Sequence, residues 1–193
     1  RNIIIQMLAR IPHIYAVLIK NKVRVAVMSV NEVTTDIPEH SDLSPRTYWD
    51  RRARGLGATL IRPATSCAEE NLLCYDDDPY KGEDILIHEF AHTIHQLGLS
   101  LTVSNFDEEL EDCYAEAKRK GLWRDTYAIS NLEEYFAEGV QSWFNLNREA
   151  IPADGIHNEI NTLSELQEYD TMLFNLISKY FFEDDYAVSC QAN

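Results

Sequence analysis

The sequence has few basic residues and no long hydrophobic segment. Lysine and arginine together number 17 against 32 aspartates and glutamates, which gives a formal net charge of −15 at pH 7 and a pI near 4.7. Nucleic acids and anionic membranes are themselves negatively charged, so this balance argues against binding to either. The apolar run at residues 3–8 is too short to cross a membrane. We therefore expect no nucleic-acid partner and no insertion into a membrane.

Cysteine is also scarce. The four cysteines are Cys67, Cys74, Cys113 and Cys190, and none of them belongs to a C-x-x-C pair or a Cys–His cluster, so a structural zinc finger is not expected. The even number permits two disulfides, and the positions suggest Cys67–Cys74 and Cys113–Cys190, with fully reduced thiols as the alternative. Disulfides would imply an extracellular, secreted protein, although the sequence lacks an N-x-S/T glycosylation site that would support secretion.

Neither an internal repeat nor a low-complexity linker divides the chain. Its 193 residues suffice for one sizeable core, and its content of 45% hydrophobic and 25% charged residues is typical of a folded soluble protein. We expect residues 1–193 to form a single domain and the protein to be a monomer.

The periodicity of apolar residues predicts an α+β fold that is mostly helical and contains a small mixed sheet. Strands are expected at residues 23–30, 57–62 and 71–75. Helices are expected at residues 2–10, 12–19, 106–120, 130–144, 163–168 and 170–182, with a helical turn around Tyr48 and Trp49. Ser130 is the expected N-cap of the fourth of these helices, with Glu133 completing a capping box. The long surface connection at residues 31–56 is expected to form one wall of a substrate cleft.

The segment His88-Glu89-Phe90-Ala91-His92 has the pattern H-E-x-x-H. On a helix, residues four apart lie on one face, so both imidazoles can reach a single metal ion. Glu89 lies at the edge of that face, where it can contact a metal-bound water. This pattern is the zinc-peptidase signature, in which two histidines bind the metal and the carboxylate acts as general base.

The residues around the motif favour this interpretation. Apolar residues form one continuous stripe on a helix that ends at Gly98, and His88, His92 and His95 gather on the opposite side. The alternative is a solvated polar face that carries histidines by chance, but three histidines and a glutamate within eight residues are an unusual surface composition. We expect one side of this helix to face the core and the other to face a metal.

A catalytic zinc site generally has three protein ligands, so a third must come from elsewhere in the chain. The candidates are His95, His157 and the carboxylates of the helix at 130–144. His95 lies angularly between the two motif histidines and is poorly placed to close a tetrahedron. Glu134 and Glu138 share one helix face, so one of them can bind the metal while the other accepts the N–H of a ligand histidine. An exposed acidic helix face is the alternative explanation for this pair.

An H-E-x-x-H motif followed by a helix that bears E-x-x-x-E is the gluzincin arrangement. With Tyr127 seven residues before Glu134, in Tyr127…Glu134-Tyr135-Phe136-Ala137-Glu138, the core at residues 82–145 resembles the catalytic domain of anthrax lethal factor. It is similar also to the bacterial Pro-Pro endopeptidases. The resemblance implies a zincin-like fold. The chain lacks an accessory substrate-recruiting domain of the lethal-factor kind, so the substrate preferences of the family do not carry over.

The resemblance also implies a role for each matching residue. It makes His88, His92 and Glu134 ligands of Zn²⁺, Glu89 the general base, Tyr127 the residue that stabilises the oxyanion, and Glu138 an outer residue that orients a ligand. The implied function is that of a zinc-dependent endopeptidase acting on a peptide or protein substrate. The alternatives are a catalytically silent or toxin-like module that retains the fold and the metal, and a zinc hydrolase of non-peptide amides.

Overall fold

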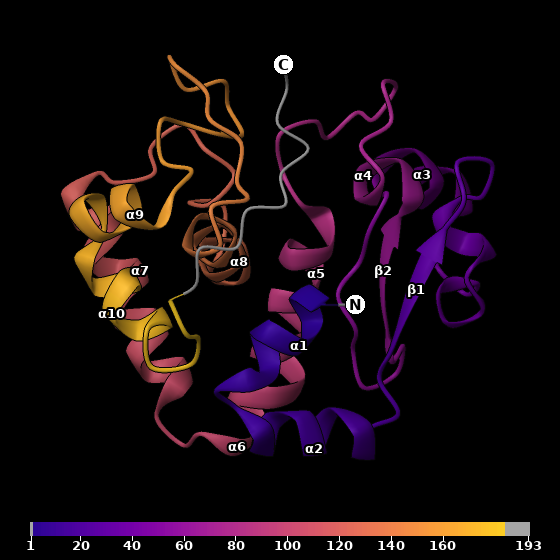
Figure 1. Ribbon diagram of the computed structural model, residues 1–193, viewed down its shortest axis with the longest axis horizontal. Helices are drawn as coiled ribbons and strands as arrows, with labels where there is room; N and C mark the ends of the chain where they lie inside the picture. The colour runs from indigo at the N-terminus through magenta and orange to yellow at the C-terminus, as the bar shows by residue number, and fades with distance from the viewer. Residues whose placement is uncertain (1, 184–193) are drawn as a thin grey trace.

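The computed structural model describes residues 2–183, in which helices predominate and one small sheet lies at the edge (Figure 1). In chain order the elements are α1 (Asn2–Ala9), α2 (Pro12–Lys20), β1 (Arg24–Met28), α3 (Arg46–Arg52), β2 (Ala64–Ala68), α4 (Glu69–Leu72), α5 (Ile85–Ile94), α6 (Ser100–Thr102), α7 (Phe106–Lys120), α8 (Leu132–Trp143), α9 (Leu163–Tyr169) and α10 (Thr171–Ile177). Short 3-10 turns at Thr34–Asp36 and Pro38–His40 follow β1. The α+β class and the predominance of helix are confirmed.

The sheet consists of β1 and β2, which run parallel with Arg24 opposite Ala64 and Met28 opposite Ala68. An antiparallel bridge between Leu56 and Ser66 adds one further contact at its edge. All five residues of β2 are buried, because this strand lies between β1 and the helical body. The expected first strand is confirmed.

The other two expected strands are wrong. Residues 57–62 form a turn, in which the backbones of Thr59 and Arg62 exchange hydrogen bonds of 2.9 and 3.1 Å. Residues 71–75 are the end of α4 and a turn, organised by the Asn71 side chain. Its amide nitrogen donates to Asp78 and to two backbone carbonyls, and its oxygen accepts from the Ile85 amide. In both segments local hydrogen bonds determine the conformation.

Helix α5 lies between β2 on one side and α8 on the other (Figure 1). Asp84 caps its N-terminus by accepting a hydrogen bond from the Ile87 amide, and Ile87, Phe90, Ala91 and Ile94 are buried. The predicted apolar stripe therefore packs as expected, with α8 and β2 holding the helix from two directions.

The sheet side of α5 is fixed by a threonine. The Thr93 hydroxyl accepts a hydrogen bond from the Ala58 amide at 2.9 Å and lies 2.6 Å from the Thr65 hydroxyl. Since all three groups are buried, these contacts satisfy polar atoms that would otherwise be costly to remove from water.

Gly98 does not end the metal-motif helix. The chain continues through a π-helical stretch, His95–Leu99, into α6. A β-carbon on Gly98 would lie 2.3 Å from Ile14 Cγ2, so glycine is required here for the close packing of α2. Gly98 therefore permits a close packing contact and does not end the helix.

Helix α8 begins one residue later than expected. Its N-cap is Asn131, whose side chain accepts from the Glu134 amide at 2.9 Å, and not Ser130. Asn131 has extended backbone dihedrals, as an N-cap residue should. The other expected helices are confirmed, including the left-handed Gly121 (φ 72°) that ends α7, except that the helix expected at 170–182 ends at Ile177.

The predicted disulfide pairs are both wrong. Cys67 in β2 and Cys113 in α7 are free, buried thiols that pack in the core, and Cys190 lies outside the described residues. Burial raises the pKa of Cys67 to about 12 and that of Cys113 to about 11. Both side chains therefore behave as small hydrophobic residues and not as thiolate nucleophiles.

Within residues 2–183, no helix alone combines the length and the apolar character needed to span a membrane. The helices Ile3–Ala9 and Pro12–Lys20 meet that criterion only as a pair, with a bend of 117° between them.

Candidate metal centre

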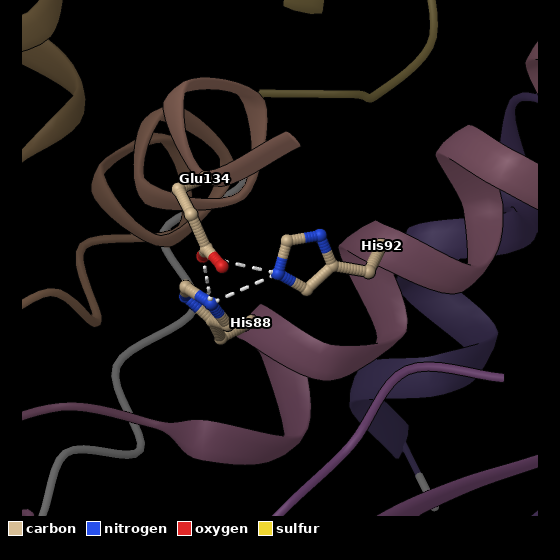
Figure 2. A group of neighbouring side chains, drawn as sticks. All are labelled: His88, His92 and Glu134. Carbon is tan, nitrogen blue, oxygen red and sulfur yellow. Dashed lines mark hydrogen bonds and ion pairs between the residues drawn. The ribbon is translucent and has the colours of Figure 1, made fainter. Parts of the chain in front are cut away.

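The packing of α5 against α8 brings His88, His92 and Glu134 together (Figure 2). Glu134 Oε2 lies 2.9 Å from His88 Nε2 and 3.2 Å from His92 Nε2. The two Nε2 atoms are 3.1 Å apart. Together these three residues can hold one metal ion. No second group of potential metal ligands occurs among the described residues.

The donor set fits zinc. Two imidazole nitrogens and one carboxylate oxygen are typical ligands of catalytic zinc. With bonds of about 2.0–2.1 Å, tetrahedral ligand atoms lie about 3.3 Å apart. The observed spacings of 2.9, 3.1 and 3.2 Å are close to this value, so a small adjustment would accommodate the ion. Burial acts to raise the pKa of Glu134, but hydrogen bonds with His88 and His92 outweigh it and hold that pKa well below its ordinary value.

The orientation of the His88 ring is set by Gln141. His88 Nδ1 lies 2.8 Å from Gln141 Oε1, and Gln141 Nε2 donates to the backbone carbonyl of Asp84 at 3.2 Å. An amide oxygen only accepts hydrogen bonds, so Nδ1 carries the proton and Nε2 is left to face Glu134. Sequence reasoning missed Gln141. The available signal was its position on α8, seven residues after Glu134 and three after Glu138, on the same helix face.

Glu138 lies behind the same histidine. Its Oε1 is 3.6 Å from His88 Nδ1, and its Oε2 accepts a hydrogen bond from Asn147 at 3.0 Å. Burial raises the pKa of Glu138, against the opposing effects of His88 and Asn147. The carboxylate is within ion-pair distance of His88, whereas the hydrogen bond itself goes to Gln141. The role of Glu138 in orienting a ligand stays a prediction.

Tyr127 contacts the third member of the group. Its hydroxyl donates to Glu134 Oε1 at 2.9 Å and accepts from the Arg52 guanidinium at 3.1 Å. Burial and the neighbouring Glu134 carboxylate raise the pKa of Tyr127 to about 12, so the phenol remains protonated at neutral pH. Arg52 was missed by sequence reasoning, because it is 75 residues from Tyr127 in the chain and belongs to no motif.

The residues just before β2 reach the candidate metal centre, whereas the expected role of residues 31–56 as a wall of a substrate cleft stays a prediction. A β-carbon on Gly55 would lie 2.9 Å from Glu89 Cγ, and one on Gly57 would lie 2.7 Å from His92 Cβ. Glu89 is half-buried beside this segment. Burial raises the pKa of Glu89, although His88 and His92 act in the opposite direction. Its assignment as general base stays a prediction.

The two other histidine candidates lie away from the group. His95 Nε2 is 3.6 Å from Asp107 Oδ1, and the ring packs edge-on against Phe106 and Phe136 at centroid distances of 5.3 and 5.4 Å. His157 Nε2 is 3.4 Å from Glu83 Oε2. The geometric argument against His95 as a ligand agrees with this arrangement.

Comparison with protein-family models, with curated proteins and with solved structures gives no match. The likeness to gluzincins therefore depends on the residues of the site and on their spacing.

Zinc binding is expected to release about one proton at neutral pH. Burial acts to lower the pKa of His88, but the hydrogen bond with Glu134 and the charges of Glu89 and Glu138 raise it to about 10. In the absence of metal His88 is thus protonated at pH 7.5, and it must lose that proton to coordinate. Zinc affinity should consequently rise by about tenfold per pH unit between pH 7 and 9.

The measurement is calorimetric titration of the metal-free protein with zinc in buffers of different ionisation enthalpy. A binding enthalpy that is independent of the buffer would contradict the predicted proton release.

Proposed function

We propose that this protein is a zinc-dependent endopeptidase that hydrolyses bonds in a peptide or protein substrate. The observation that carries the proposal is the convergence of His88, His92 and Glu134, with the Tyr127 hydroxyl on the second oxygen of Glu134. This combination joins a ligand set suited to catalytic zinc to a neutral hydrogen-bond donor beside it.

Bound zinc would supply a Lewis acid and would make water acidic enough to lose a proton near neutral pH. His88 and His92 would hold it from α5, and Glu134 would hold it from α8. Gln141 keeps His88 in the tautomer that coordination requires. Each ligand is thus fixed by a helix or by a side-chain contact before the substrate arrives.

Glu89 provides the proton acceptor. It follows His88 directly on α5 and is half-buried, so its pKa is raised toward the range in which a carboxylate both accepts and returns a proton. In the proposed reaction Glu89 takes the proton from the attacking water. It then passes this proton to the amine that leaves when the peptide bond breaks.

Tyr127 provides the hydrogen bond to the oxyanion. The phenol keeps its proton at neutral pH and can turn from Glu134 to the oxygen of the reacting carbonyl. The positive charge of Arg52, 3.1 Å from the hydroxyl, favours negative charge on that side of the site.

The proposal is tested by incubating the zinc-loaded protein with a denatured protein mixture, with and without a chelator. We expect new peptide termini that disappear with the chelator and return when zinc is added back. A protein that binds zinc and yields no new termini would instead be the catalytically silent module. A peptide library would then define the residues preferred on each side of the cleaved bond.

Replacing Tyr127 with phenylalanine should lower turnover by about 100- to 1,000-fold, because one oxyanion donor is lost. Zinc content should not change, since Tyr127 contacts the ligand Glu134 and is not itself one of the three grouped residues. The measurements are kcat on one peptide and metal content by mass spectrometry. Tyr15→Phe, at an exposed tyrosine of α2, is the matched control. Loss of zinc in Tyr127→Phe would assign Tyr127 a structural role.

A further inference from the structure

The segment between α8 and α9 folds back on itself at residues 150–158. The Ala150 amide donates to the Asn158 carbonyl at 2.7 Å, which closes the segment at its base. Asp154 Oδ1 accepts from the amides of Ile156 and His157 at 2.9 and 2.8 Å. These bonds connect the tip to the base and stabilise the folded-back conformation of the segment.

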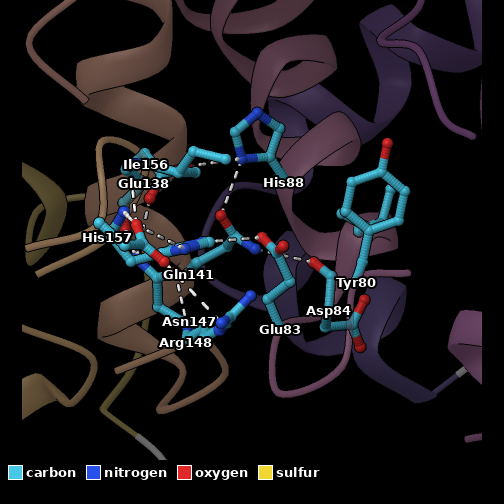
Figure 3. A network of polar contacts seen from close by, with 12 residues as sticks. Tyr80, Glu83, Asp84, His88, Glu138, Gln141, Asn147, Arg148, Ile156 and His157 are labelled. Atoms are coloured by element: carbon cyan, nitrogen blue, oxygen red, sulfur yellow. Dashed lines mark hydrogen bonds and ion pairs between the residues drawn. The ribbon is translucent and has the colours of Figure 1, made fainter. Parts of the chain in front are cut away.

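His157 anchors this segment in the body of the protein. Residues 151–156 are exposed, whereas only 4% of His157 is exposed. Figure 3 shows its ring between Glu138 and the residues that precede α5, and its Nε2 lies 3.4 Å from Glu83 Oε2. Glu83 immediately precedes Asp84, the cap of α5.

Electrostatics strengthens this anchor. Burial acts to lower the pKa of His157, but the hydrogen bond and charge of Glu83, with a further contribution from Glu138, raise it. The side chains of His157 and Glu83 are 2% and 8% exposed, so the pair interacts with little screening by solvent. His157 was one of the candidate metal ligands, but it lies outside the single metal-binding group found among residues 2–183.

The same segment holds the backbone of Tyr127. The Tyr127 amide donates to the Ile156 carbonyl at 2.8 Å, one residue before His157. A continuous series of contacts thus runs from the start of α5 through Glu83, His157 and Ile156 to Tyr127 (Figure 3 shows all but Tyr127). Because His88 and His92 lie on α5, these contacts link the backbone of Tyr127 to the helix that carries the two histidines.

The Tyr127 loop has a second attachment on its other side. Trp123 donates through its indole to Asp170 and through its amide to the Tyr169 hydroxyl. These contacts hold the loop to α9 and α10, which pack against α8. The Ile156 contact links the backbone of Tyr127 to the start of α5, while the Tyr127 ring itself stacks on His88 of the same helix at a centroid distance of 6.5 Å.

We propose that His157 is a positioning residue: it seats the 150–158 segment against the start of α5 and so keeps Tyr127 at hydrogen-bond distance from Glu134. This inference rests on the proposed function in one respect, namely that Tyr127 acts in the reaction. A displacement of about 1 Å at such a donor is enough to lower the rate by about a hundredfold.

The first test is amide hydrogen exchange in the metal-free protein, which requires no activity. In His157→Ala, exchange at the Tyr127 amide should accelerate by about tenfold or more, because its acceptor is no longer held in place. Exchange within α7 and α10 should be unchanged. Ile151→Ala, at a 74% exposed residue of the same segment, is the matched control and should leave the Tyr127 amide protected. Should His157→Ala fail to fold, Glu83→Gln weakens the same contact from its other side and should have the same local effect.

The second test uses peptide hydrolysis. His157→Ala should lower kcat with little change in KM or in zinc content, whereas in a Tyr127→Phe background it should cause no further loss of kcat. His157→Gln, which keeps a donor for Glu83, should recover part of the rate. Wild-type protection of the Tyr127 amide in His157→Ala, or additive losses in the double variant, would overturn the proposal. If no variant and no wild-type protein cleaves peptides, the proposed function fails and the exchange result still decides the positioning contact.

Discussion

Replacing Glu89 with glutamine is expected to abolish peptide hydrolysis while zinc stays bound. Glutamine has nearly the same shape as glutamate, which matters because Gly55 packs closely against Glu89 and leaves little room. The amide cannot accept a proton, so the reaction loses a general base that contributes about 100- to 10,000-fold in rate. Since Glu89 is not among the grouped residues His88, His92 and Glu134, the metal donors are unaffected.

This result is checked by measuring kcat and zinc content on the same preparation. Glu108→Gln, an exposed position on α7, is the control for loss of one negative charge. Turnover at the native rate in Glu89→Gln would remove Glu89 from the mechanism. Loss of zinc would instead show that Glu89 supports the metal centre.

Replacing Glu134 with alanine is expected to cause the largest loss of zinc affinity of any single change on α8. The substitution removes one of three donors and leaves the two imidazoles 3.1 Å apart without the carboxylate that faces both of them. It also removes the acceptor of the Tyr127 hydroxyl, so turnover should be lost together with the metal.

The comparison variants are Glu138→Ala and Gln141→Ala, which leave all three donors in place. Each should weaken zinc by about 10- to 100-fold, the usual effect of losing a partner of a ligand histidine. Competition with a zinc-binding dye measures all three affinities, and Glu133→Ala on the same helix is the control. If Glu134→Ala and Glu138→Ala weaken zinc equally, the assignment of Glu134 as the ligand would be incorrect.

The convergence of α5 and α8 could be predicted because it depends on helical periodicity. The four-residue spacings of His88 with His92 and of Glu134 with Glu138 place each pair on one face, and apolar residues on the other faces require the helices to be buried. Once two such helices pack together, the histidines on one face and the carboxylate on the other are close enough to bind the same metal ion.

Arg52 and Gln141 could not be predicted in the same way. The contact of Arg52 with Tyr127 spans 75 residues and depends on how α3 packs in the folded chain. Gln141 shares the face of Glu134, but its role follows from its distance to His88 Nδ1, which spacing alone does not give.

The errors in the sheet and the cysteines have a related origin. The segments at 57–62 and 71–75 are short apolar runs whose conformation is decided by hydrogen bonds of Thr59 and of the Asn71 side chain. Cys67 and Cys113 are free thiols buried in the core, and cysteine spacing carries no information about which pairs meet in space.

The two glycines beside α5 restrict how this protein can diversify. At Gly55 and Gly57 the main chain lies directly against Glu89 and His92, so neither position has room for a β-carbon. Any larger residue at either position would push the chain off the helix, which leaves mutation few ways to reshape that side. Evolutionary variation in the proposed substrate choice would therefore have to arise elsewhere, in the loops that precede α8 and α9.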